Sequence, residues 1–147
     1  DSFSEKSIDL CRKTFSSENM MSDENRSFLM IASYLGGCAI ATSYVGIVHP
    51  LSAGLSVVFG THHCIANCIV MRAMEEFYPI YYKEFWSFVE INEISIPQDI
   101  CKNSDDQEFE KLYHASIIHE KPLTNALGAD FKSILTKQKV KELFLKM

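Results

Sequence analysis

A long segment without charged residues constrains this chain more than any other feature. Between Arg26 and Arg72 the sequence contains no Asp, Glu, Lys or Arg. Such a segment favours burial, either in a protein core or in a membrane. Small residues, polar residues and the dipeptide His49-Pro50 interrupt it, and no basic flanks or aromatic belts frame a span of about 20 residues. We therefore predict a pair of buried helices rich in small residues, and no membrane association.

The composition excludes several classes of protein. A chain of 147 residues that is 47% hydrophobic can form a core, so we do not expect disorder. A net charge of −5, without a stripe of Lys and Arg, argues against nucleic-acid binding. The five cysteines show no disulfide-framework spacing, which favours reduced thiols and a cytoplasmic location. The first residue is Asp1 rather than Met, and we expect the natural chain to begin further upstream.

Helical periodicity runs through most of the sequence, and no segment alternates with period two for long enough to predict a strand. We predict an all-α fold, a bundle of about seven helices in a single domain over residues 1–147. The first helix should cover residues 3–17. The second should be capped by Ser22 and, because it is uncharged on every face, buried nearly all round.

The segment around His49 should contain two helices joined by a reversal. Pro50 suits the first turn of a helix, so we place His49 at the boundary before it. Gly60 should end this helix, and Thr61 should cap the next one, which runs to about residue 77.

Shorter helices should follow. Proline and capping residues set their expected bounds. We predict helices over residues 81–91, 106–119 and after Thr136, a cap at Asp105, a helical turn over residues 97–101, and helix ends at Pro79 and Pro122.

His49 and His63 are the candidate metal ligands. On one unbroken helix their positions would be about 21 Å apart, too far to share an ion. A reversal that uses Gly54, Gly60 and Thr61 would bring them together. His63 would then lie in the first turn of a helix, where the helix dipole and burial favour the neutral imidazole that a metal requires. The alternative is that both histidines are hydrogen-bonded core residues.

The other reactive side chains give weaker patterns. Cys64 and Cys68 share a helix face and could bind zinc with a neighbouring histidine, but the spacing is not CxxC, and packing explains them better. His114 and His119 do not share a face, and we place both at the surface or at a boundary. No G-x-S-x-G motif or Gly-rich loop after a strand supports nucleophilic catalysis or phosphate binding.

The segment GIVHPLSAGLSVVFGTHHCIANCIVM resembles the signature of the iron-containing (group III) alcohol dehydrogenase family. In that family a helix rich in small residues ends in a His, a second His opens a helix fourteen residues later, and an Asn follows four residues on. His49, His63 and Asn67 match these positions. The resemblance covers essentially the whole chain, most specifically residues 28–79. Within the family the chain looks most similar to the 3-deoxy-octulosonate 8-oxidases.

This resemblance implies a metal-dependent alcohol dehydrogenase whose C-terminal domain is all-helical. A divalent iron or zinc ion binds the substrate hydroxyl, and hydride passes to NAD or NADP, so that a primary alcohol becomes an aldehyde. Of the four protein ligands that usually hold the ion, two carry over to His49 and His63. The implied substrate is a small alcohol or sugar acid, such as 3-deoxy-octulosonate at its C8 hydroxyl, and the implied assembly is a homo-oligomer.

Several departures limit what these residues can do alone. The family's Asp-x-x-x-His ligand pair and its dinucleotide-binding domain are absent, and we expect both upstream of Asp1. Ala53 stands where the family often has a further His, while His62 and Cys64 replace a frequent Pro and the usual Gly. We therefore expect the 147 residues to be inactive by themselves. The alternatives are a dehydroquinate-synthase-like cyclase domain and a non-catalytic helical interaction module.

Overall fold

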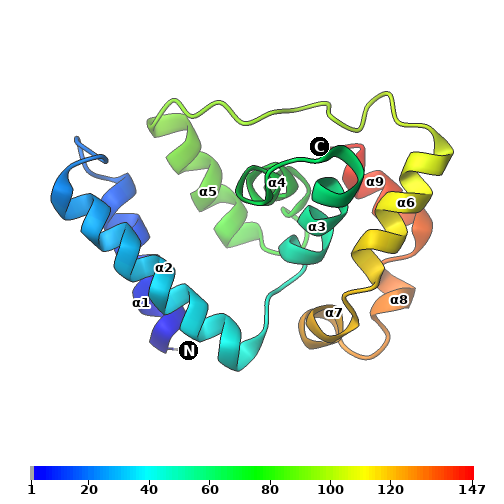
Figure 1. Cartoon of the computed structure of the whole chain (residues 1–147), viewed down its shortest axis with the longest axis horizontal. Helices are drawn as coiled ribbons and strands as arrows, with labels where there is room; N and C mark the ends of the chain where they lie inside the picture. The colour runs from blue at the N-terminus through cyan, green and yellow to red at the C-terminus, as the bar shows by residue number, and fades with distance from the viewer. Residues whose placement is uncertain (1) are drawn as a thin grey trace. The chain divides into compact units, whose positions relative to one another are not determined.

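The computed structural model describes residues 2–147, and over these residues it is all-helical (Figure 1). It contains nine α-helices, one 3-10 helix and no strand within that range, which confirms the predicted class. The chain divides into two compact units, the first ending at Tyr44 and the second being Val45–Met147. The single metal-binding domain over residues 1–147 stays a prediction, and both histidines on which it rests lie in the second unit.

The first unit is a hairpin of α1 (Ser2–Phe15) and α2 (Asp23–Ser43), which lie side by side (Figure 1). Ser22 caps α2 as predicted, because its Oγ accepts a hydrogen bond from the backbone N–H of Asn25 at 3.2 Å. Ser7 joins the two helices by donating its hydroxyl to the carbonyl of Ala32 at 2.8 Å.

Helix α2 is not buried nearly all round, so that prediction is wrong. Its buried residues are Asn25, Ala32 and Ala39, while Met30 and Tyr34 are 71% and 73% exposed. A two-helix hairpin covers one face of each helix, which leaves the other faces of α2 without a partner in this unit. Absence of charge predicts that a helix can be buried, but not how many neighbours it has. Within residues 2–147, no single helix is long and apolar enough to cross a membrane.

The second unit is built around α3 (Val48–Phe59), which has α4 (His63–Val70) on one side and α6 (Asp106–Ile117) on the other (Figure 1). Gly54 allows α6 to approach closely, since a Cβ at this position would lie 2.7 Å from Ser116 Oγ and 3.2 Å from the carbonyl oxygen of Leu112. The largest side chains that are almost fully buried in this core include Leu51, Leu55, Ile69, Leu112, Leu143 and Phe144.

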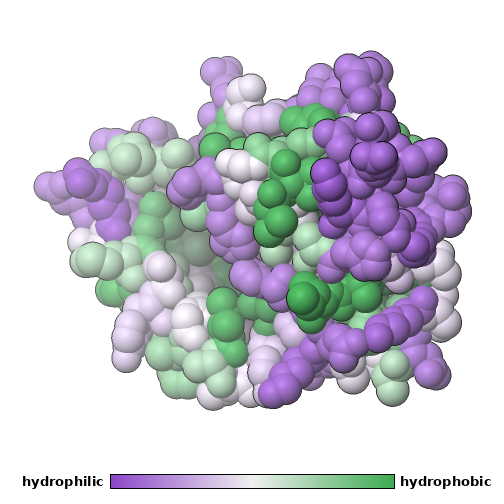
Figure 2. All heavy atoms as spheres, turned by 45° about the vertical axis from the view of Figure 1, so that its right-hand side comes forward, coloured by the Kyte–Doolittle hydropathy of each residue, from purple (hydrophilic) through white to green (hydrophobic). Residues whose placement is uncertain are grey.

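Three more helix boundaries follow the predicted local chemistry. Gly60 ends α3 in the left-handed conformation, with φ of 66°. Asp105 caps α6 in a capping box with Glu108, and Thr136 caps α9 (Lys137–Phe144) by accepting from the N–H of Lys139. Figure 2 turns the α6 side toward the viewer, and much of this side is hydrophilic. An ion pair between Lys141 and Asp106, at 2.7 Å, links α9 to α6.

The boundaries next to two prolines differ from the prediction. Pro79 does not stop a helix but begins α5 (Pro79–Ile91). Pro122 lies in the first turn of α7 (Glu120–Leu127). A first-turn N–H has no partner within its helix, so proline costs no hydrogen bond there. Both prolines therefore lie in the first turn of a helix rather than ending one.

Other differences concern short segments. His62 rather than Thr61 is the N-cap of α4, and its side chain makes no capping hydrogen bond. Helix α4 ends at Val70 and passes into the 3-10 helix η1 (Met71–Ala73), well before residue 77. Residues 97–101 form no helix, while α8 (Phe131–Ile134) was not predicted.

Candidate metal centre

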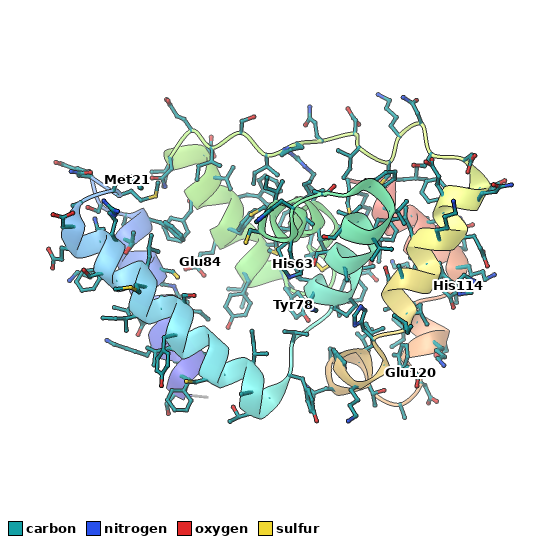
Figure 3. All side chains as sticks on the ribbon, in the orientation of Figure 1. Met21, His63, Tyr78, Glu84, His114 and Glu120 are labelled. Carbon is teal, nitrogen blue, oxygen red and sulfur yellow. The ribbon has the colours of Figure 1, made fainter. Side chains whose placement is uncertain are left out.

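His49 and His63 lie next to each other, as the predicted reversal requires. Their ring centroids are 4.7 Å apart, with the ring planes at 76°. Helix α3 carries His49 in its first turn, Gly60 ends that helix, and the chain then returns so that His63 is the first residue of α4. In Figure 3, His63 lies near the start of α3.

The start of α3 is held in place by Tyr78. Its hydroxyl oxygen accepts a hydrogen bond from the backbone N–H of Ile47 at 3.3 Å. Gly46 leaves room for this contact, because a Cβ there would lie 2.6 Å from the Tyr78 oxygen. Ser52, one turn further on, is buried and donates its hydroxyl to the carbonyl of His49 at 2.9 Å. The backbone around His49 is therefore fixed from both sides.

The two histidines differ in their surroundings. His49 is half-buried, whereas His63 is exposed. The prediction that His63 is the buried histidine is therefore wrong, and burial acts on His49 instead. Burial lowers the pKa of His49, and the nearby imidazoles of His63 and His119 lower it further. The neutral imidazole is the form that binds a metal. His49 is therefore suited to ligation at neutral pH.

The separation of the pair fits a shared ion. Two imidazoles that bind one tetrahedral ion through N–metal bonds of about 2.1 Å have ring centroids about 5 Å apart. The observed 4.7 Å is close to that value. Within residues 2–147, however, no group of three His, Cys, Asp or Glu side chains is arranged to hold an ion. The described residues thus bring two candidate ligands together and do not form a complete ligand set.

A third imidazole, that of His119, lies beside the pair and was missed in the sequence. Its ring centroid is 6.0 Å from that of His49, with the planes at 79°. His119 is the half-buried N-cap residue of α7, and its side chain makes no capping hydrogen bond. No motif or spacing links it to His49, because it arrives through the packing of α6 on α3. The placement of His114 at the surface is confirmed: it lies on the outer side of α6, away from His63 (Figure 3).

Asn67 lies one turn after His63 on α4, where the resemblance places an Asn. Its side-chain oxygen is buried and accepts no hydrogen bond. Burying an acceptor without a partner costs about 1–3 kcal/mol. A polar group kept in such a position against a stability cost calls for an explanation other than packing.

Cys64 and Cys68 do not join the histidines as ligands. Cys64 is exposed, which differs from the predicted packing role, and Cys68 is half-buried. Burial raises the pKa of the Cys68 thiol, and the neighbouring Cys64 raises it further. A protonated thiol is a poor ligand. Both cysteines instead line an apolar groove of about 340 Å³ together with residues 94–97.

No known protein-family model matches the chain. The resemblance to the group III alcohol dehydrogenases therefore depends on the motif residues alone.

Proposed function

We propose that this chain is the helical metal-binding part of an NAD(P)-linked alcohol dehydrogenase that oxidises a primary alcohol to an aldehyde. One observation carries the proposal. His49 and His63 are fourteen positions apart in the sequence, and the centroids of their imidazole rings lie 4.7 Å apart. That separation suits two ligands of one ion, and the spacing of the two residues matches the family motif.

In this proposal His49 and His63 would hold a divalent iron or zinc ion. The chemistry that such an ion supplies is the polarisation of a bound hydroxyl, which eases loss of its proton. The lowered pKa of His49 keeps one ligand neutral, and the contacts of Tyr78 and Ser52 hold its backbone in place. An Asp and a further His from outside these 147 residues would complete the ligand set. The nicotinamide site would also lie outside them.

The substrate class follows from the resemblance alone. A small alcohol or sugar acid is proposed, with the terminal hydroxyl of 3-deoxy-octulosonate as the specific candidate. Because the described residues supply two ligands, the 147-residue chain by itself should not reduce NAD or NADP with any of these alcohols.

The test uses the full-length protein that carries the chain. His49→Ala and His63→Ala should each lower the bound metal and abolish NAD(P)-dependent alcohol oxidation, because removing one ligand weakens the site. His114→Ala is the matched control: this exposed histidine on α6 bonds Glu110 and should change neither quantity. Full activity of the His63→Ala enzyme would overturn the proposal.

Metal analysis of the same protein separates the alternatives. A non-catalytic helical module, with His49 and His63 as structural residues, would contain no bound ion. A dehydroquinate-synthase-like cyclase would contain one but would not oxidise alcohols.

A further inference from the structure

We propose that the exposed face of α2 binds a second copy of this chain, with the two α2 helices running antiparallel to each other. Met30, Tyr34, Gly37 and Ala41 define this face, and all four are exposed. The opposite face of α2 carries its buried residues, and α1 packs against the same helix (Figure 1). The inference is independent of the histidine pair and of the proposed function.

The four residues follow the spacing of a coiled-coil seam. Met30, Tyr34, Gly37 and Ala41 are separated by four, three and four positions. Side chains at this spacing form one stripe along a helix, which can pack against the matching stripe of a second helix. A stripe that faces water normally carries charged residues, whereas α2 has none after Arg26. Burying this stripe therefore removes no charge from water.

The order of the side-chain sizes selects the orientation of the second copy. The large residues, Met30 and Tyr34, precede the small ones, Gly37 and Ala41. A two-fold axis at the middle of the stripe sets Tyr34 opposite Gly37 of the second copy, and Met30 opposite Ala41. A Cβ on Gly37 would have nothing within 4 Å, so the space above it is open to a tyrosine ring. A parallel pair would instead set Tyr34 against Tyr34 and leave a void between the two glycines.

The charges at the start of α2 favour the same orientation. Asp23 and Glu24 lie in its first turn. In a parallel pair the first turns of both copies would be adjacent, and these carboxylates would repel each other. In an antiparallel pair they lie at opposite ends of the contact.

The area of this contact is sufficient for a weak dimer. Four large apolar side chains on or beside the stripe are about half or more exposed: Met30, Ile31, Tyr34 and Ile40. Side chains of this size that are so exposed offer roughly 100 Å² each, so pairing two copies would bury on the order of 1,000 Å² in total. Specific interfaces begin near this area, which predicts a reversible dimer rather than a permanent one.

The experiment measures the dimer dissociation constant of the 147-residue chain by sedimentation equilibrium. Gly37→Leu should raise this constant at least about tenfold, because the leucine occupies the space that Tyr34 of the second copy fills. Tyr34→Ala should raise it similarly, because it removes the ring that fills that space. An equimolar mixture of the two variants should recover most of the wild-type affinity, since each heterodimer again sets a large residue opposite a small one at both positions.

Two further measurements serve as controls. Tyr81→Ala, which removes an exposed tyrosine from α5, should leave the dissociation constant unchanged. Circular dichroism should show that the Gly37→Leu chain is folded, because the space around Gly37 is open within the chain. Ala41→Leu mixed with Met30→Ala tests the same pairing at the second large–small position, should either of the first variants fail to fold.

Three results would overturn the inference. A wild-type chain that stays monomeric at all concentrations has no such interface. A Gly37→Leu chain that dimerises as tightly as the wild type or more tightly indicates a parallel pair or unspecific apolar association. Mixtures that bind no more tightly than their separate variants exclude the antiparallel pairing of large with small residues.

Discussion

His49 is the residue on which the candidate site depends most. It is half-buried and contacts both other imidazoles of the cluster, those of His63 and His119. Burial, followed by the two neighbouring rings, lowers its pKa and favours the neutral form. Two properties that metal ligation requires, a fixed backbone and a neutral ring, are therefore combined in one residue.

The lowered pKa of His49 predicts a loss of stability in acid. A histidine with a lower pKa in the folded than in the unfolded chain is protonated more readily after unfolding. Its contribution is fully present above the unfolded pKa of about 6.5 and is lost as the pH falls through the folded pKa. Below about pH 6.5 the free energy of unfolding, measured in urea, should therefore fall more steeply in the wild-type chain than in His49→Gln. Parallel pH profiles would contradict this.

Helix α3 is central to the second unit because it packs against another helix on each of two sides. One side meets α4, which begins with His63, and the other meets α6, which leads to His119. Gly54 is a point of close approach to α6, where a Cβ would also lie 3.3 Å from the ring of Phe144. The distance between α3 and α6 thus depends on the absence of one side chain.

Gly54→Ala should destabilise the chain even though alanine is the better helix former. Forcing a methyl group into this contact costs about 1–3 kcal/mol, and the gain in helix propensity offsets about 1 kcal/mol of it. Thermal unfolding followed by circular dichroism should show a lower midpoint. Gly37→Ala is the control, because Gly37 lies within α2 with nothing within 4 Å of its would-be Cβ, and that change should be neutral or stabilising. A Gly54→Ala chain as stable as the wild type would refute the close-packing argument.

At the scale of the whole molecule, large apolar side chains remain exposed to solvent. In the first unit, Met30 and Tyr34 are four residues apart on α2 and are each more than two-thirds exposed. Exposed apolar patches of this kind favour association. The homo-oligomer expected from the resemblance stays a prediction, and this surface is one place where it can be examined.

Light scattering should show self-association of the 147-residue chain that increases with concentration. Met30→Lys combined with Tyr34→Lys should shift the chain toward the monomer, because two charges on this face of α2 oppose its burial. Leu145→Lys, at an exposed position after α9, is the control and should have little effect. A wild-type chain that remains monomeric at all concentrations would contradict this prediction.

Helix ends were predictable where their cause is local. Ser22, Gly60, Asp105 and Thr136 all end or begin helices as expected. A cap bonds an N–H two or three residues away, and a glycine needs only its own backbone freedom. Prolines were less informative, because the same fixed φ that ends one helix also suits the first turn of the next.

The sequence by itself determined the all-helical class and these caps, and it showed that a reversal at Gly60 could bring His49 and His63 together without deciding that it does. Only the tertiary structure decided that α2 is largely exposed, that His63 is exposed while His49 is half-buried, and that His119 joins the site. The reason is physical. A cap or a reversal is settled within a few residues, whereas burial and the meeting of distant side chains depend on which helices pack together, here on α6 approaching α3 at Gly54.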